Sequence, residues 1–280
     1  MSAVVLGAGG MLGRRLANEF PQAAAYTRAE ADLTDAERVE AVVSPGVTLV
    51  LNAAAHTRVD DAETDPAHLR VNAEAVTALA RRCREVGAVL VHVSTDYVFG
   101  GRGTRPYRED EAVDPVNAYG AGKLAGEQGV AESGAEALVV RTSWVYGTGG
   151  ANFVDAILKQ AEAGKSELRV VADQTGRPTY AADLARAIRL LVDRGARGIV
   201  HFANAGETTW FDFAREALRL AGREDVLVRP CSSADFPRPA RRPAYSVLDT
   251  SLYERTVGEK PRLWREALRD YVEARLPVSS

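Results

Sequence analysis

A glycine-rich turn near the start of the chain constrains the fold more than any other stretch. Residues 3–6 form a short apolar run, and residues 7–13 follow with glycines at positions 7, 10 and 13. Residues 14–20 then have the composition of a helix. A buried strand, a glycine turn and a helix in this order indicate a dinucleotide-binding unit in a parallel sheet. The alternative is a purely structural turn, which any α/β protein can contain.

The three spaced glycines each have a physical role in the dinucleotide-binding interpretation. Gly7 permits a tight turn, and Gly10 lets the backbone approach a pyrophosphate at the helix N-terminus. Backbone amides and the helix dipole favour negative charge at that end. Gly13 allows the helix to pack closely on the strand. The sequence therefore predicts a phosphate-binding turn at residues 7–13.

The rest of the chain predicts a Rossmann-like α/β fold, a doubly wound parallel sheet with a smaller C-terminal α/β substrate lobe. Apolar runs at 23–26, 47–51, 88–93 and 137–142 predict further strands, and segments such as 66–86 predict the helices between them. Beyond these strands the pattern becomes mixed and aromatic, which favours a second lobe that closes over a cofactor. We expect a dinucleotide-binding domain at 1–143, to which 181–203 returns, and a substrate-binding lobe at 144–180 and 204–280.

The end of the second predicted strand bears on the choice of cofactor. A dinucleotide fold often has an acid here that binds the ribose 2′-hydroxyl, but this chain has Thr27 and Arg28. A positive charge in place of a negative one suits a 2′-phosphate, so we predict NADPH, with NADH as the alternative. The alternative is that Arg28 is a solvated loop residue. Thr34 is the predicted N-cap of the next helix, because Glu37 stands three residues later.

Tyr119 and Lys123 are the candidate acid/base pair. They stand four residues apart, and a helix places such residues one turn from each other on one face. A free tyrosine has a pKa of about 10, which a nearby ammonium lowers. The pair can then exchange a proton with a carbonyl or alcohol oxygen. The alternative for this spacing alone is a half-buried tyrosine beside a solvated lysine.

Polar side chains follow the fourth predicted strand, directly before the loop that leads to this pair. Ser94, Thr95 and Asp96 stand at the carboxyl end of that strand, where ligands of open α/β sheets bind. Hydroxyls and a carboxylate there are well placed for chemistry. The alternative is a capping or turn cluster.

Composition excludes several other classes of protein. The chain of 280 residues carries a net charge of −3 and no long basic run, so no nucleic-acid partner is expected. No apolar run approaches the length of a membrane span, and we expect no membrane association. Cys83 and Cys231 lack metal-ligand spacing, and the histidines form no zinc motif, so we predict no metal site. Reduced thiols of this kind indicate a cytoplasmic protein.

Over nearly its whole length the chain resembles the extended short-chain dehydrogenase/reductases, and most closely the dTDP-4-dehydrorhamnose reductase family. The glycine turn and the Tyr119–Lys123 pair are shared by the superfamily. Three other motifs are much more specific. The resemblance rests on six motifs in order, at residues 7–13, 52–57, 94–99, 119–123, 141–147 and 173–179.

This resemblance implies a reaction in which NADPH reduces the 4-keto group of a nucleotide-activated 6-deoxysugar. Thr95, Tyr119 and Lys123 would form the catalytic set. Tyr119 would give its proton to the ketone oxygen, and Thr95 would donate a hydrogen bond to the developing alkoxide. Lys123 would lower the pKa of Tyr119 and bind the nicotinamide ribose.

The resemblance also implies the residues that bind the two ligands. Asp96 and Trp144 match the sugar contacts of the family, and Asn152 and Gln174 are candidate contacts in the substrate lobe. Some members use magnesium ions in a dimer, but Arg15 stands at one such position, which argues against metal-mediated pairing and leaves a homodimer open. The implied cofactor contacts are Gly7, Gly9, Gly10, Met11, Leu12, Gly13, Thr27, Arg28, Asp32, Leu33, Ala53, Ala54, Ala55, Tyr119 and Lys123.

Two other functions fit parts of the same pattern. A sugar-nucleotide dehydratase or epimerase has the same fold, but a dehydratase is expected to have an Asp-Glu pair after the threonine, where this chain has Asp96 and Tyr97. The chain also resembles the regulatory subunit of methionine adenosyltransferase, which binds NADP without catalysis. The intact Thr95, Tyr119 and Lys123 set favours an enzyme.

Overall fold

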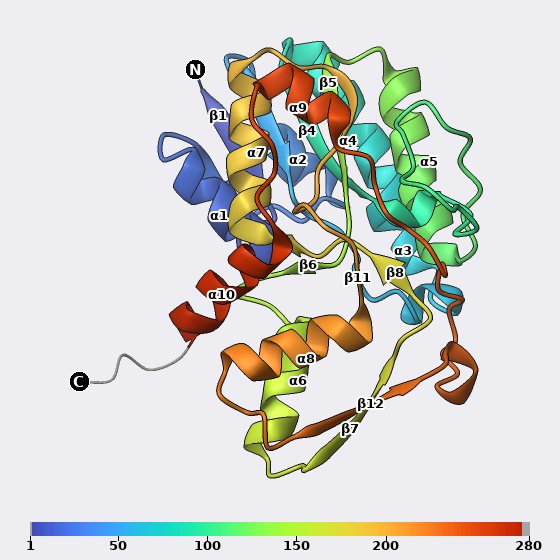
Figure 1. The fold of residues 1–280 in the computed structure, drawn as a ribbon. Coiled ribbons are helices and arrows are strands. Elements are labelled where there is room, and N and C mark those ends of the chain that lie inside the picture. The colour runs from blue at the N-terminus through green and yellow to red at the C-terminus, as the bar shows by residue number, and fades with distance from the viewer. Residues whose placement is uncertain (1, 276–280) are drawn as a thin grey trace.

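Six parallel strands form the central sheet of the computed structural model, which describes residues 2–275 (Figure 1). The strand order is β10-β5-β4-β3-β1-β2. The order reverses at β1, because β2 lies on one side of β1 and β3 lies on the other. Ligands of open α/β sheets bind at such a reversal. The strands are β1 (Ala3–Leu6), β2 (Ala24–Tyr26), β3 (Leu49–Asn52), β4 (Val89–Thr95), β5 (Ala137–Thr142) and β10 (Gly198–His201).

Alternate residues of each strand face two apolar layers, as a sheet covered on both faces requires. In β1, Val5 packs in the layer of α1, α7 and α9, whereas Val4 and Leu6 pack in the layer of α2, α4 and α5. The doubly wound parallel fold predicted from the sequence is confirmed. The helices are α1 (Met11–Glu19), α2 (Ala36–Val42), α4 (Ala75–Val86), α5 (Ala118–Ser133), α7 (Ala181–Asp193) and α9 (Ser251–Val257).

A smaller lobe lies below the carboxyl edge of the sheet in Figure 1 and has its own apolar core. Aromatic side chains dominate that core, with Tyr146 in edge contact with both Phe213 and Tyr271. We use "the lobe" for the elements α6 (Phe153–Glu162), β7 (Glu167–Val171), α8 (Trp210–Leu220), β12 (Leu227–Cys231) and α10 (Trp264–Arg275).

Several short elements connect the lobe to the sheet. Strand β8 (Thr175–Gly176) pairs with β11 (Thr208–Thr209), and β6 (Val145–Tyr146) pairs with β9 (Thr179–Tyr180). Helix α9 lies within the range 204–280, yet its Tyr253 and Val257 pack in the core of the central sheet. The division into two domains therefore stays a prediction.

The helix predicted at 66–86 is interrupted. The structure has α3 (Ala67–Leu69), a π-helical turn η2 (Arg70–Glu74) and then α4. Asn72 is buried in the π turn, where its side chain accepts a hydrogen bond from the His56 amide and donates one to the His56 carbonyl, both at 2.9 Å. Because these bonds fix the backbone after β3, the irregular turn has a structural reason that helix propensity does not reveal.

Two features bear on the expectations about a membrane span and about the two cysteines. No helix within residues 2–275 has both the length and the apolar character needed to cross a membrane. Cys83 and Cys231 are buried and form no disulfide in the structure. The sequence also predicts a terminal helix near Trp264 to Leu276, which agrees with α10 as far as Arg275, whereas Leu276 lies outside the described residues.

Candidate active site

A cavity of about 850 Å³ lies where the strand order reverses, between the sheet and the lobe. The turn after β1, the chain after β3 and the end of β4 line it from the side of the sheet. Phe153, Gln174 and Trp210 line it from the other side. Ligand sites of this size commonly lie between two structural units, so the cavity is the candidate active site.

The glycine turn fits a phosphate-bearing cofactor. Gly7 has a φ of +78°, and a Cβ there would lie 2.7 Å from the Ala54 nitrogen. A Cβ on Gly13 would lie 2.1 Å from the Gly7 oxygen, so these two glycines are required by the protein itself. A Cβ on Gly10 would meet nothing closer than 3.4 Å, yet Gly10 lines the cavity as the N-cap of α1 without a side-chain cap. A free helix N-terminus facing a cavity suits a pyrophosphate.

The other predicted cofactor residues divide into two groups. Met11, Leu12 and the three alanines Ala53–Ala55 line the cavity. Leu33 does not, because its side chain is buried in the core beneath the sheet. Only its backbone is therefore left for a cofactor, and the cofactor contact of Leu33 stays a prediction.

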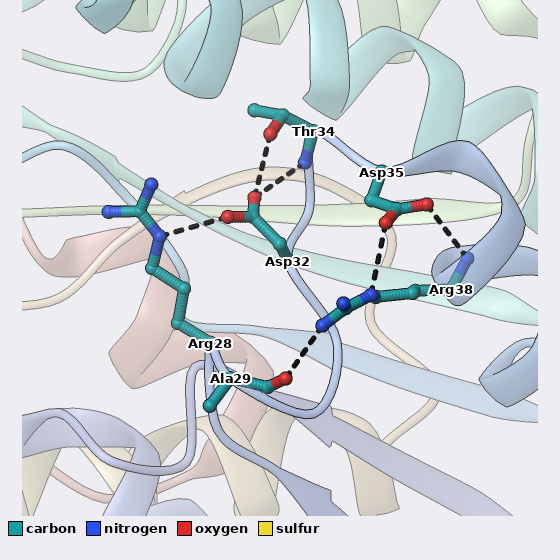
Figure 2. A pocket seen from close by; sticks show the side chains of 6 residues that line it. All are labelled: Arg28, Ala29, Asp32, Thr34, Asp35 and Arg38. Carbon is teal, nitrogen blue, oxygen red and sulfur yellow. Dashed lines mark hydrogen bonds and ion pairs between the residues drawn. The ribbon is translucent and has the colours of Figure 1, made fainter.

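A second, shallower hollow contains the residues that follow β2 (Figure 2). The Arg28 Nε donates to Asp32 Oδ2 at 3.0 Å, so the positive charge predicted for a 2′-phosphate is already paired with a carboxylate. Asp32 Oδ1 accepts from the Thr34 amide and hydroxyl at 2.9 and 2.8 Å. The Thr34 amide bond is the main cause that lowers the pKa of Asp32 to about 2. The hollow thus holds a permanent ion pair with an exposed guanidinium.

Neighbouring residues correct the predicted N-cap of α2 and add a second acidic side chain close to Arg28. The N-cap of α2 is Asp35, whose side chain accepts from the Arg38 amide, and not Thr34. The Thr34 hydroxyl instead donates to Asp32 Oδ1 (Figure 2). Thr27 donates through both its amide and its hydroxyl to Glu30 at 2.8 Å, which places another acid beside Arg28.

Helix α5 brings Tyr119 and Lys123 into the cavity wall. Asn117 caps the helix by accepting from the Gly120 amide at 2.8 Å. A Cβ on Gly120 would lie 2.2 Å from the Tyr97 oxygen, so only glycine permits this close approach of α5 to the end of β4. That approach buries Lys123, which is 2% exposed.

The electrostatics of this pair differ from the prediction. Burial raises the pKa of Tyr119 to about 12, and the charge of Asp96 adds to the shift. Burial lowers the pKa of Lys123 to about 8, against the opposing charge of Glu127. Lys123 Nζ donates to the Val93 carbonyl at 2.7 Å. In the ligand-free protein the pKa of Tyr119 is therefore raised and not lowered, because burial dominates, and the effect of Lys123 on the phenol stays a prediction.

The polar side chains at the end of β4 all line the same cavity. The Thr95 hydroxyl donates to Asp96 Oδ1 at 3.0 Å and accepts from the Tyr97 amide at 3.2 Å. Burial raises the pKa of Asp96 to about 7. The buried Ser94 hydroxyl finds no hydrogen-bond partner in the described part of the chain. An unpaired buried hydroxyl in a cavity wall fits a site that receives a polar ligand.

Two of the predicted substrate residues from the second half also reach the cavity. Trp144 has a φ of +47°, the one positive value for a residue other than glycine between positions 2 and 275, and its ring stacks on Trp210. Strained backbone of this kind often marks a functional site. Gln174 lines the cavity and donates to the Ser233 hydroxyl at 2.8 Å.

Asn152 has a structural role instead of the predicted contact with substrate. Its side-chain oxygen caps α6 by accepting from the Asp155 amide, and its side-chain nitrogen donates to the Gly147 carbonyl and the Tyr271 hydroxyl. Both ends of the amide are thus engaged. A helix-capping asparagine and a ligand-binding one look alike in sequence.

A group of cationic and aromatic residues in the cavity wall was not predicted from the sequence. Arg169, Arg238 and Arg242 line it, together with Trp210. Arg238 and Arg242 both form ion pairs with Asp60, which follows the cavity-lining residue Val59 in the chain. The arginine- and proline-rich composition of residues 230–243 was the available signal, but it could not reveal where that segment lies.

No group of three or more His, Cys, Asp or Glu side chains able to hold a metal ion is found within residues 2–275. Arg15, which stands at the possible metal position, donates to the Thr148 hydroxyl at 2.9 Å.

Comparison with known proteins gives a consistent result. A family model described as the RmlD substrate binding domain matches residues 1–276. A dTDP-4-dehydrorhamnose reductase from Mycolicibacterium smegmatis is 46% identical over 281 residues, covering 97% of this chain and 85% of the relative. A probable dTDP-4,6-dihydroxy-2-methyloxan-3-one 4-ketoreductase from Streptomyces antibioticus is 44% identical and covers 96% of this chain and 94% of the relative.

Solved structures agree. The crystal structure of dTDP-4-dehydrorhamnose reductase from Bacillus anthracis in complex with NADP superposes with a TM-score of 0.92. It is 34% identical in sequence, covering 98% of this chain and 99% of that one.

Proposed function

The chain belongs to the RmlD family of dTDP-4-dehydrorhamnose reductases, and we propose that it uses a reduced nicotinamide cofactor to reduce the 4-keto group of a dTDP-linked 6-deoxyhexose. One observation carries the proposal: a tyrosine, a threonine and an uncapped helix N-terminus line a single cavity. A phosphate site beside a buried proton donor is what the reduction of a ketone needs. Relatives at similar identity are named for rhamnose synthesis and for other deoxysugars, so the family defines the reaction class.

Tyr119 acts as the proton donor. A pKa of about 12 keeps the phenol protonated at neutral pH, which is the form that reduction consumes. The bound cofactor supplies a hydride to the carbonyl carbon, and Tyr119 gives its proton to the carbonyl oxygen. A phenol with this pKa is still a stronger acid than an alcohol, so the transfer to a developing alkoxide is favourable, and a hydrogen bond or a positive charge that stabilises the phenolate makes it more so. Lys123, one helical turn away in the same wall, is placed to supply such a charge.

Thr95 and Asp96 orient the sugar. In the ligand-free protein the Thr95 hydroxyl donates to Asp96, so donation to a substrate oxygen needs a rotation of that hydroxyl. With a pKa of about 7, Asp96 exists in both forms near neutrality and can accept from or donate to a sugar hydroxyl. The two side chains therefore form a polar surface that a polyhydroxylated ring can occupy.

The dTDP portion is bound by the part of the cavity wall that contains the two stacked tryptophans and the segment after β12. The stacked Trp144 and Trp210 offer an aromatic surface, and Arg238 and Arg242 offer two guanidinium groups for the diphosphate. In the ligand-free protein both arginines pair with the Asp60 carboxylate, which occupies an anion position. Gln174 adds a polar contact in the same wall.

The preferred cofactor is NADPH, with NADH as the weaker alternative. The supporting observation is the exposed Arg28 guanidinium in the hollow after β2, where a 2′-phosphate would lie in this fold (Figure 2). The small residues Ala53–Ala55 and the turn at 7–13 receive the rest of the dinucleotide. A homodimer stays a prediction.

The test is direct assay with NADPH and a panel of dTDP-4-keto-6-deoxyhexoses. We expect loss of NADPH absorbance with at least one sugar, and a 4-hydroxyl product in the NMR spectrum. A dehydratase or epimerase would alter the sugar without net oxidation of NADPH. A regulatory subunit would bind NADPH and turn over none of the panel, and either result would overturn the proposal.

A further inference from the structure

A buried histidine connects Lys123 to the end of β3. His92 on β4 is fully buried, and it stands opposite Asn52 in the register of β3 and β4. His92 Nδ1 lies 3.2 Å from Asn52 Nδ2, and His92 Nε2 lies 3.2 Å from Lys123 Nζ. The reaction described above assigns no role to this histidine.

A backbone amide determines the orientation of the whole chain of contacts. The Ala54 N–H can only donate, and it points at Asn52 Oδ1 at 3.0 Å. The Asn52 NH₂ group must therefore face His92, and it donates to Nδ1. An imidazole nitrogen that accepts carries no proton, so the proton of neutral His92 lies on Nε2.

That tautomer has a consequence for the lysine. His92 Nε2–H is a donor, and its neighbour is Lys123 Nζ. An ammonium has three donors and no acceptor, so it cannot accept this hydrogen bond. An amine can, and it still donates to the Val93 carbonyl at 2.7 Å. Every contact in the network is satisfied only when Lys123 is neutral.

We propose that His92 is a positioning residue that sets the charge of Lys123: with its proton on Nε2, it holds the lysine as an amine in the ligand-free protein. This deepens the proposed function, on which its meaning for turnover rests. A lysine that is an amine at rest can take up and return a proton as the charge of the site changes. A lysine with an ordinary pKa stays charged at neutral pH throughout.

The surrounding charges fit this assignment. Glu127 lies one turn along α5 and favours an ammonium, but its carboxylate is bound by Arg141 through three contacts of 2.7 to 3.2 Å. Asp96 and Tyr119 line the same cavity as Lys123, and both have raised pKa values. Burial lowers the pKa of His92 well below its usual value, so His92 itself does not become a cation at neutral pH.

The composition of the chain makes a direct test practical. It contains four lysines, Lys123, Lys159, Lys165 and Lys260, and four histidines. The test labels the lysine Cε and Nζ atoms and the imidazole nitrogens and follows their NMR shifts with pH in the ligand-free, full-length protein. Lys123→Met identifies the Lys123 signal, and His92→Gln identifies the His92 signals.

The expected spectrum has a protonated Nε2 and an unprotonated Nδ1 in His92. Burial alone lowers the pKa of Lys123 to about 8, and the His92 tautomer should lower it further, so the Lys123 signal should titrate with a midpoint below about 7. A proton on His92 Nδ1, or a Lys123 midpoint above about 7, would overturn the proposal. Because the wild-type protein is measured, the result does not depend on catalytic activity. A failed reductase assay would leave it standing.

Variants of Asn52 separate the tautomer from simple burial. Asn52→Asp replaces the donor with an acceptor, so the His92 proton should move to Nδ1 and the Lys123 midpoint should rise by roughly one pH unit or more. Asn52→Ala removes the constraint without adding charge and should shift the midpoint in the same direction. The matched control is Asn204→Ala, which removes another buried asparagine, in contact with Tyr180 and Asp183. It should leave both signals unchanged. An Asn52→Asp protein with the wild-type His92 tautomer would contradict the mechanism even if its lysine titration shifts.

Discussion

The indole ring of Trp144 lies parallel to that of Trp210, with their centroids 3.5 Å apart and an angle of 8° between the planes. Trp144 follows β5 of the central sheet, and Trp210 begins α8 of the lobe. A face of the pair lines the cavity. The stack thus joins the two halves of the molecule at the place where the substrate is proposed to bind.

Removal of one partner should weaken substrate binding more than chemistry. We expect Trp210→Leu to raise KM for the dTDP-sugar about three- to tenfold, because an aromatic pair contributes about 0.5–1.5 kcal/mol. The value of kcat should stay within about twofold. Phe211→Leu is the control, since Phe211 is adjacent but does not line the cavity. Equal effects of the two substitutions would show that α8 is merely destabilised.

The two arginines that face Asp60 should matter for the diphosphate. Arg242→Ala should raise KM for the nucleotide sugar at least about tenfold, since hydrogen bonds between charged groups contribute about 1.5–3 kcal/mol. The Kd for NADPH should change little. Arg229→Ala, which removes an arginine of β12 that pairs with Glu167 of β7, should leave both constants unchanged. A loss of NADPH affinity in Arg242→Ala would show that this part of the cavity wall binds the cofactor and not the nucleotide sugar.

Arg28 should distinguish the two nicotinamide cofactors. Arg28→Ala should weaken NADPH binding by about fivefold and leave NADH binding unaffected, because an exposed charge contributes about 1 kcal/mol. Fluorescence titration of both cofactors gives the comparison. Arg38→Ala is the control, because Arg38 lies in the same hollow but is held by Asp35 and the Ala29 carbonyl (Figure 2). If Arg28→Ala weakens NADH as much as NADPH, the preference for a 2′-phosphate has another origin.

Asp96 should make the stability of the protein depend on pH. Its pKa is raised from 3.8 to about 7 in the folded state, so the folded protein binds the extra proton between these values. Stability should therefore fall as pH rises from about 4 to about 7, by at most about 4 kcal/mol. Asp96→Asn should not lose stability in this way, because an asparagine side chain does not ionise. The difference in unfolding free energy between the variant and the wild type, from urea denaturation, should grow between about pH 4.5 and pH 8. A constant difference would mean that Asp96 ionises normally.

The sequence predicted the sheet because strand and helix periodicity are local properties. The glycine turn, the end of β4 and the Tyr119–Lys123 spacing were correctly brought to one cavity, since the carboxyl ends of parallel strands meet at one edge. The charge state of Tyr119 was not predictable, because it depends on how deeply α5 is packed. Spacing along a helix shows which residues are neighbours but not how much water reaches them.

Other errors have equally physical causes. Asn152 was taken for a ligand contact because capping and binding asparagines share a sequence signal, and its cap is visible only once α6 is placed. Arg238 and Arg242 reach the cavity from a segment more than a hundred residues beyond α5. The ion pair between Arg28 and Asp32, by contrast, is local, because the two residues stand four positions apart. It was not predicted because the positive charge of Arg28 was considered without the carboxylate of Asp32.

The central claim is that the phenol of Tyr119 protonates the ketone. The most direct measurement is the turnover of Tyr119→Phe with NADPH and a dTDP-4-keto sugar, together with the Kd of the variant for NADPH. Tyr97→Phe is the matched control, because that ring lies edge-on to Tyr119 at 6.1 Å in the same cavity wall. The account predicts a loss of about 10²–10⁴-fold in kcat for Tyr119→Phe, with the Kd for NADPH within about twofold of wild type. A Tyr119→Phe protein that keeps more than about a tenth of the wild-type rate would contradict it.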